Sequence, residues 1–286
     1  MYATRYSSGR VFCMGDAVHR HPPMNGLGSN TSIQDAWNLT WKLALVLKGK
    51  ASPALLDTYN EERAPIGRQI VKRANKSIEE TGPIFDALGL HETTEAAQML
   101  RNMEARKADT PEAAAQRENL RKAIAHKSYE FNTHGVEMNQ RYRSAAVVSD
   151  GTPEPAFDRD PELHYHPTTW PGARLPHVWL QKDGRPVSTL DIAGKGRFVV
   201  LTGIGGEGWV EAARKAAAVY GIGIEGFVIG PGRDLTDLYG EWAEARGICE
   251  TGCLLVRPDA HVGWRAENTG NQEIRLLEAV ARILGR

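Results

Sequence analysis

The stretch GRVFCMGDAVHRHPPMNGLGSNTSIQDAWNLTWKLALVLKG, Gly9–Gly49, decides the fold of this 286-residue chain. Its apolar run Val11–Met14 leads into a Gly-Asp pair and predicts a short buried strand. Apolar residues then recur at helical spacing over Thr31–Lys48, and a final lysine followed by glycine is typical of a helix end. Open α/β sheets bind ligands beyond the carboxyl ends of their strands. The strand, the acid and the helix together therefore predict part of a ligand site.

The acid in this stretch is Asp16, whose carboxylate can accept hydrogen bonds from the hydroxyls of a ribose or ribityl chain. Gly26–Asn30 leads into the helix, and glycine lets the backbone approach a ligand closely. The first N–H groups of a helix have no partner inside it, so they favour negative charge. A strand, a Gly-Asp turn and a helix also occur as plain structure in α/β proteins. These residues alone therefore leave the ligand open.

A second helix is expected to begin at Ser52-Pro53, and Pro65 is expected to kink or restart it. The polar segment Glu92–Lys127 is expected to be helical, with a Thr-Pro-Glu helix start at Thr110. Ser149–Arg174 is rich in Pro, Asp and Gly, so we place a domain boundary there.

Strands and helices alternate beyond this boundary, which predicts a small α/β domain. The expected strands are Phe198–Thr202, Gly226–Ile229, Cys253–Val256 and His261–Arg265. The expected helices are Trp209–Tyr220, Asp234–Arg246 and Asn271–Leu284. These elements form a set that we expect to fold by itself.

The composition excludes several classes of partner. Lys plus Arg and Asp plus Glu number 35 each, so no general attraction to nucleic acid or anionic membrane is expected. The N-terminus has no apolar signal-peptide core, and no apolar run is long enough to span a membrane. Three cysteines do not suggest a disulfide framework, so we expect a reducing cytoplasm.

Two patterns in the C-terminal third invite a redox or nucleotide interpretation. Gly203–Gly208 satisfies GxGxxG after a strand, but no acid clearly ends the next strand and there are too few βα units for a dinucleotide fold. Cys249 and Cys253 are spaced CxxxC rather than CxxC, which favours incidental thiols over a redox or metal pair.

Histidine pairs and tryptophans in the chain are expected to be structural. His19 and His21, like the second H-x-H pair at His164, lack the carboxylates or cysteines that a metal site needs, so we expect no metal. His19 and His21 are expected to line the ligand loop as polar residues. Trp37 and Trp41 are expected on the buried face of the first long helix.

The opening stretch resembles the second flavin-contacting segment of the FAD-dependent aromatic hydroxylases, a family that includes phenol and 2,4-dichlorophenol 6-monooxygenases. The resemblance covers nearly the whole chain in several long motifs that occur in the same order. Beyond the opening stretch they are LLDTYNEERAPIGRQIV (Leu55–Val71), PGARLPHVWL (Pro171–Leu180), FVVLTGIGGEGW (Phe198–Trp209) and GCLLVRPDAHVGWRA (Gly252–Ala266).

The resemblance implies a role for each matching residue. Asp16 would bind the ribityl or ribose part of FAD, and the helix start would point N–H groups at the flavin ring. The cofactor-binding residues implied in this way are Asp16, Pro23, Gly26, Leu27, Gly28, Ser29 and Asn30. Pro22 and Met24 would lie beside the substrate ring. No catalytic acid or base is assigned, because the family's phenol-activating groups have no counterpart in this chain.

The resemblance also implies the domain organisation of an α/β protein. Residues 1–80 would be part of an FAD-binding domain, residues 81–166 a helical connecting part of the substrate domain, and residues 167–286 a thioredoxin-like domain. The family's GxGxxG pyrophosphate loop does not precede Tyr6. The chain is therefore expected to be the C-terminal portion of a longer hydroxylase.

The function implied is hydroxylation of a phenolic substrate with FAD, O2 and either NADPH or NADH. We expect the chain alone to be inactive and the enzyme to be a homo-oligomer, most simply a dimer. The alternative is a non-catalytic thioredoxin-like interaction module that retains a piece of a flavin domain.

Overall fold

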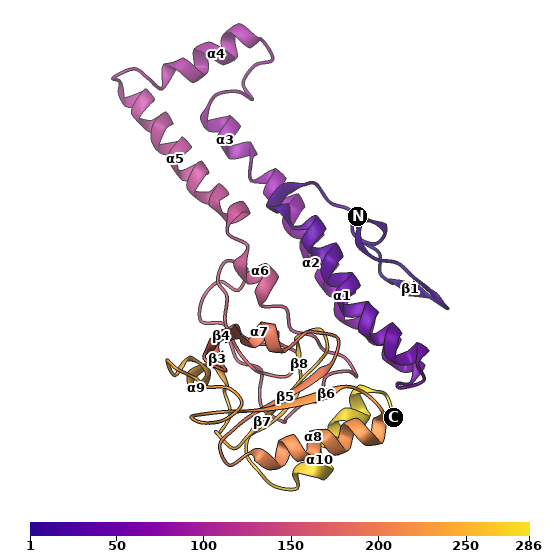
Figure 1. Ribbon diagram of the computed structural model, residues 1–286. Coiled ribbons are helices and arrows are strands. Elements are labelled where there is room, and N and C mark those ends of the chain that lie inside the picture. Colours follow the sequence, from indigo (N-terminus) through magenta and orange to yellow (C-terminus); the bar gives the residue numbers. More distant parts are fainter.

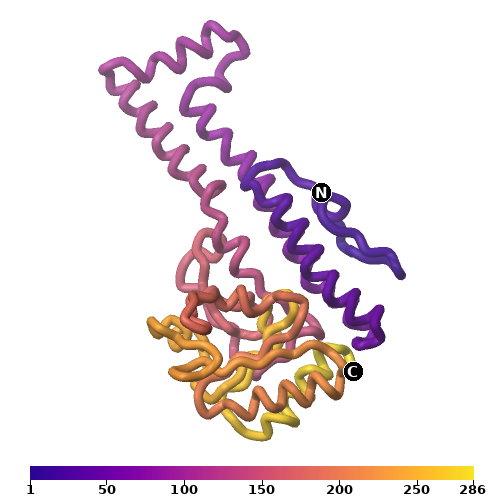
Figure 2. The backbone as a smooth tube through the Cα atoms, in the orientation of Figure 1, coloured from indigo at the N-terminus to yellow at the C-terminus, as the bar shows by residue number.

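A computed structural model describes residues 1–286. Two bodies make up the molecule: a long helical part from the first half of the chain and a small α/β domain from the second (Figure 1). The backbone trace shows the N-terminal hairpin lying along the paired helices α1 and α2, and the C-terminus near the far end of that pair (Figure 2). No helix is both long and apolar enough to cross a membrane.

The expected buried strand is replaced by a small exposed hairpin. Strand β1, Ser7–Ser8, pairs antiparallel with β2, Val11–Phe12. Val11 is 65% exposed and Met14 is 39% exposed, so the prediction of burial is wrong for this structure. The physical reason is that the hairpin has no further strand beside it, and of its strand residues only Phe12 packs against a buried cluster.

The two long helices form where the sequence predicts them. Helix α1 spans Gly28–Leu47, and α2 spans Asp57–Glu79 after a single 3-10 turn at Pro53–Leu56. Pro65 lies inside α2 without ending it, so the expectation of a restart is wrong. Pro65 removes one backbone donor from the interior of α2, and the helix continues on both sides of it to Glu79.

The polar middle of the chain forms a helical arm that extends away from the α/β domain (Figure 1). Its helices are α3, Gly82–Ala87; α4, Ala96–Ala105; and α5, Pro111–Phe131, followed by the short α6, His134–Met138. The Thr110 hydroxyl accepts the Ala113 N–H at 3.2 Å, which confirms the predicted helix start.

The C-terminal domain contains a four-stranded sheet in the order β6-β5-β7-β8. Strands β5, Phe198–Gly203, and β6, Ile224–Ile229, are parallel. Strand β7, Cys253–Val256, is antiparallel to β5, and β8, Val262–Ala266, is antiparallel to β7. Helices α8, Glu207–Tyr220, and α10, Gln272–Ile283, lie together over one face of the sheet (Figure 1). This βαβ unit followed by a ββα unit is the thioredoxin-like topology expected.

Two features of this domain differ from the prediction. A hairpin of β3, Trp179–Lys182, and β4, Arg185–Ser188, leads into the short helix α7, Thr189–Ile192. The predicted helix Asp234–Arg246 shrinks to α9, Glu241–Ala245. The Asp234 carboxylate accepts the Val228 N–H at 2.8 Å instead, and backbone pairing of Leu235 and Thr236 extends strands rather than a helix.

The largest hydrophobic core crosses between the two bodies. Trp41, Ala51 and Leu55 pack in the same buried cluster as Phe198 and Trp209. The Trp41 and Phe198 rings meet edge to face with centroids 5.9 Å apart. The expectation that the second domain is a self-contained set is therefore wrong.

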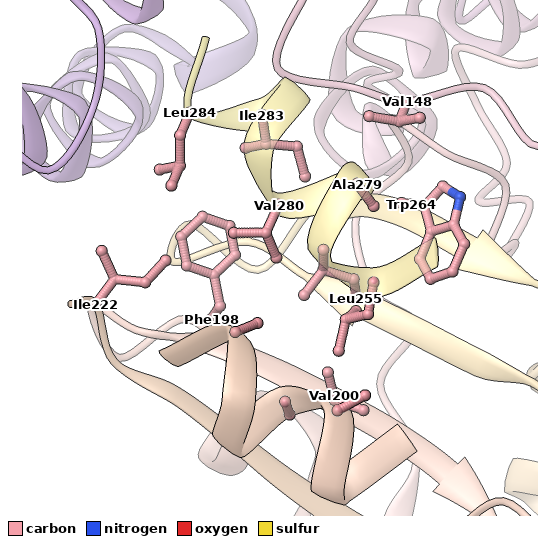
Figure 3. Close-up of a cluster of buried hydrophobic side chains, with 14 of the residues drawn as sticks. Val148, Phe198, Val200, Ile222, Leu255, Trp264, Ala279, Val280, Ile283 and Leu284 are labelled. Atoms are coloured by element: carbon pink, nitrogen blue, oxygen red, sulfur yellow. The ribbon is translucent and has the colours of Figure 1, made fainter. Parts of the chain in front are cut away.

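The sheet side of this cluster is built from alternate strand residues. Figure 3 shows Phe198, Val200 and Leu255 beside Val280 of α10. Side chains of successive residues point to opposite faces of a strand, so these three share the face that α10 covers.

Candidate functional site

The Gly-Asp turn lies against the first turns of α1. Gly15 has φ +61°, and a Cβ built on it would lie 2.9 Å from the Ser32 Oγ and 3.1 Å from the Ser32 Cβ. Only glycine combines this left-handed conformation with so close an approach. The turn Gly15–Ala17 leaves Asp16 exposed at the surface beside the helix.

A buried carboxylate that sequence reasoning missed anchors this turn. Asp35 of α1 is fully buried and accepts the Gly15 N–H at 3.0 Å. Its oxygens also contact His19 Nε2 at 2.8 Å and accept Arg63 Nε at 2.7 Å. Burial would raise the pKa of Asp35, but the His19 hydrogen bond and the Arg63 charge outweigh it and lower that pKa.

His19 therefore belongs to the core. It is completely buried, so the expectation that it lines the ligand loop is wrong. His21 is half-buried, and its Nδ1 donates to the Pro22 carbonyl at 2.7 Å. Trp41 is 6% exposed as predicted, whereas Trp37 is 51% exposed, so the prediction that Trp37 lies on a buried face is wrong. Trp37 and Trp41 are four residues apart on α1, and Trp41 packs in the core that α1 shares with the C-terminal domain.

The start of α1 presents free backbone donors. The N–H groups of Gly28, Ser29 and Asn30 have no hydrogen-bond partner, whereas the Thr31 N–H already donates to the Leu27 carbonyl at 3.0 Å. Ser29 and Asn30 are exposed, and the Asn30 amide donates to Glu137 Oε1 at 3.3 Å. Such a helix start stabilises negative charge that approaches it.

Hydrogen bonds from α2 and α5 fix the loop that precedes α1. Asn25 has φ +68°. Its side-chain Nδ2 donates to the Glu130 backbone carbonyl at 3.0 Å, and its side-chain Oδ1 accepts the Ser77 hydroxyl at 2.9 Å. Leu27 is 3% exposed in a core cluster with Ile66 and Ile70, so only its main chain can face a ligand.

The predicted loop residues around Leu27 lie at or near the surface. Pro22 and Met24 are half-buried, and Pro23 and Gly26 are exposed. The structure thus brings the predicted residues to two neighbouring places, the exposed Gly-Asp turn and the loop with the start of α1. This donor and acceptor set fits a flavin nucleotide: a carboxylate for hydroxyl groups and free N–H groups for an electron-rich ring.

A second buried charge cluster joins α1, α2 and the C-terminal domain. Its charged members are Lys42 of α1, Glu62 of α2, and Arg257 and Asp259 after β7, and all four are at most 3% exposed. Glu62 accepts Lys42 Nζ at 2.8 Å and Arg257 Nη1 at 2.6 Å. Sequence analysis missed this cluster. The available signal was a polar stripe at Asp35, Asn38 and Lys42 inside an apolar helix.

Other segments of the chain occupy the space beside the glycines of the loop Gly203–Gly208. A Cβ on Gly203 would lie 2.5 Å from the Glu250 carbonyl oxygen, and one on Gly208 would lie 2.7 Å from Gln272. These glycines therefore serve close packing of α8 against a loop and α10. Cys249 and Cys253 are both free thiols.

Comparison with known proteins agrees with this geometry. A family model described as an FAD binding domain matches residues 1–74, and one described as the C-terminal domain of aromatic-ring hydroxylases matches residues 168–286. The chain is 58% identical to the 2,4-dichlorophenol 6-monooxygenase of Delftia acidovorans over 288 residues, 99% of this chain and 49% of that protein. The chain is similar over nearly its whole length to the FAD-dependent aromatic hydroxylases.

Further relatives show the same relation. The phenol 2-monooxygenase of Pseudomonas sp. (strain EST1001) is 52% identical over 267 residues, 93% of this chain and 44% of that protein. The crystal structure of the flavin-dependent monooxygenase PieE in complex with FAD and substrate superposes with a TM-score of 0.92 at 52% identity. The superposition covers 98% of this chain and 48% of the PieE chain.

The chain thus spans about half the length of the curated relatives that it matches. Its last 119 residues match the C-terminal model of the family, as the expected C-terminal portion requires. The match to an FAD binding domain confirms FAD as the cofactor inferred from the resemblance.

Proposed function

We propose that this chain supplies one wall of the FAD site in an aromatic monooxygenase that hydroxylates a phenol with NAD(P)H and O2. The observation that carries the proposal is the pairing of an exposed Asp16 with three free N–H groups at the start of α1. When bound, FAD would supply the electron transfer and the oxygen activation.

Each residue of the wall would act on a different part of the cofactor. Asp16 would accept hydrogen bonds from ribityl or ribose hydroxyls, and the N–H groups of Gly28, Ser29 and Asn30 would hold negative charge on the flavin ring. These donors are fixed by the helix, so they stabilise charge without reorganising. Pro23, Gly26 and the Leu27 main chain would border the same cofactor.

Pro22 and Met24 would contact the phenolic substrate from the loop. Buried Asp35 holds the Gly-Asp turn, and Asn25 ties the loop to buried Ser77 and Glu130, which keeps the two surfaces at a constant spacing. We further propose that the enzyme works in the cytoplasm as a homodimer. Support comes from the exposed thiols of Cys13 and Cys249 and from apolar side chains such as Leu100 and Ile124, exposed on the arm.

A fusion enzyme tests the proposal. The chain would be joined to the part of the Delftia acidovorans relative that it does not match. The expected product binds FAD and oxidises NADPH or NADH in a 2,4-dichlorophenol-dependent reaction that yields a catechol. The chain without that part is expected to show no turnover. A colourless fusion that folds would instead favour a non-catalytic thioredoxin-like module.

Asp16→Ala in the fusion tests the assigned role of this residue. Loss of hydrogen bonds from an ionised acceptor should weaken FAD binding by about ten- to a hundred-fold, or about 1.5–3 kcal/mol. The variant should melt at the same temperature as the parent apoprotein, because Asp16 is exposed. Fluorescence quenching by added FAD measures the affinity. Unchanged FAD affinity with a lower melting temperature would show that Asp16 is only a turn residue.

A further inference from the structure

We propose that the thioredoxin-like domain holds the Gly-Asp turn in place through two adjacent buried ion clusters that meet on α2. This assigns a positioning role to Arg257 and to Glu62, neither of which contacts the flavin-facing residues directly. Its consequence for FAD rests on the proposed function. The structural coupling itself does not.

In the first cluster, every N–H donor of the Arg257 guanidinium has an acceptor. Its Nη1 and Nη2 donate to the two Glu62 oxygens at 2.6 and 2.8 Å. Its Nε and Nη2 donate to the two Asp259 oxygens at 3.1 and 2.6 Å, and Nη1 also donates to the Ala146 carbonyl at 3.3 Å. All five N–H donors are therefore used, in the bidentate geometry that only arginine offers.

The hydrogen bonds of this cluster join the two bodies, and each body contributes one positive and one negative side chain. Lys42 and Glu62 belong to α1 and α2, whereas Arg257 and Asp259 belong to the C-terminal domain. Asn38 of α1 donates to Glu62 at 2.6 Å and to Asp259 at 3.3 Å, which closes the network. Separating the two bodies would keep one ion pair on each side, but it would break the bidentate Glu62–Arg257 contact and the Asn38–Asp259 hydrogen bond, and buried polar groups without their partners are costly.

The second cluster begins at the next residue of α2. Arg63 donates to Asp35 at 2.7 Å, and Asp35 accepts the Gly15 N–H at 3.0 Å. Both Glu62 and Arg63 are at most 1% exposed. Adjacent residues of α2 thus contact both partners. Glu62 binds Arg257 of the C-terminal domain, and Arg63 binds Asp35, which holds the Gly-Asp turn. The β1–β2 hairpin has no sheet beside it, and besides these ion pairs Tyr59 and Asn60 of the same helix bond the backbone of Cys13 and Tyr6.

Hydrogen exchange measured by mass spectrometry tests this coupling on the whole 286-residue chain. Arg257→Met removes the bridge. The matched control is Arg197→Met, because Arg197 pairs with Glu225 at the surface of the same domain. In Arg257→Met, peptides covering Gly15–Asp35 should exchange at least about tenfold faster than in the parent, while β5 peptides stay protected. Arg197→Met should leave both regions unchanged.

Several results would overturn the inference. One is unchanged exchange over Gly15–Asp35 in a variant whose β5 strand stays protected. Another is an equal loss of protection in every peptide, which would indicate general destabilisation alone. If Arg257→Met does not fold, Arg257→Lys decides in the same way, because it keeps the charge but cannot bridge two carboxylates. No flavin takes part in the measurement, so its failure leaves the proposed function to the fusion experiment.

Discussion

At the residue scale, Gly15 carries a steric requirement that the Gly-Asp pair alone does not reveal. Its positive φ of +61° is shared with Gly9, which has φ +58° and no atom within 4 Å of a built Cβ. The two glycines therefore separate the cost of a left-handed backbone from the cost of contact with Ser32.

Gly15→Ala is expected to lower the free energy of unfolding by about 2–3 kcal/mol, and Gly9→Ala by about 1 kcal/mol. Both substitutions place alanine in the left-handed region, but only the first also forces a Cβ against Ser32. Urea unfolding followed by circular dichroism measures the two losses. Equal losses would show that Ser32 moves aside freely and that the turn is not tightly seated on α1.

At the element scale, the start of α8 occupies the place where a redox-active thioredoxin carries its paired thiols, but glycines stand there. Cys249 lies elsewhere, and a hydrogen bond from its thiol to Glu267 raises the pKa of that thiol. Burial raises the pKa of Cys253 strongly. Neither thiol is therefore a ready nucleophile at neutral pH.

We expect no disulfide oxidoreductase activity from the domain. In the insulin-reduction assay with dithiothreitol, the chain should precipitate insulin no faster than the uncatalysed control. A Cys249→Ser, Cys253→Ser double variant should behave identically. Turnover in the parent chain that disappears in this double variant would contradict the expectation.

At the scale of the whole molecule, three buried carboxylates hold the parts together. Burial would raise the pKa values of Asp35, Glu62 and Asp259, but the nearby Arg63, Arg257 and Lys42 charges and the hydrogen bonds outweigh it. All three pKa values are therefore lowered in the folded state. Burial lowers the pKa of Lys42 to about 8, although the Glu62 charge opposes that change.

The lowered carboxyl pKa values predict how stability depends on pH. Each carboxylate contributes fully above its unfolded pKa near 4, and its contribution is lost as the pH falls, because the unfolded chain binds protons first. Urea midpoints should therefore fall between about pH 5 and pH 3.

Glu62→Gln tests this pH dependence against Glu61→Gln, because Glu61 is the exposed neighbour on the same helix and forms no ion pair. Glu62→Gln should be less stable at pH 7 and show a shallower loss below pH 5, by about 1.4 kcal/mol for each unit of pKa difference removed. Glu61→Gln should follow the parent curve. Parallel curves for the parent and Glu62→Gln would show that Glu62 is not a source of acid sensitivity.

The sequence by itself determined the elements whose cause is local. The period of apolar residues predicts α1, and the Thr-Pro-Glu start predicts α5, since a cap and a helical stripe act within a few residues. Strands β5 and β7 follow from short apolar runs. The Gly-Asp turn with its glycine-led helix, recognised by resemblance, predicts that Asp16 and Gly28–Asn30 contact the flavin, and this stays a proposal.

Only the tertiary structure decided which charged residues are buried and which apolar ones are exposed. Glu62 and Arg257 are 195 positions apart, and no local pattern shows that they meet. The exposure of Val11 and Trp37 was likewise not predictable, because burial depends on which surfaces other segments cover. Helix formation is a property of nearby residues, whereas the pairing of buried charges requires the whole chain to bring them into contact.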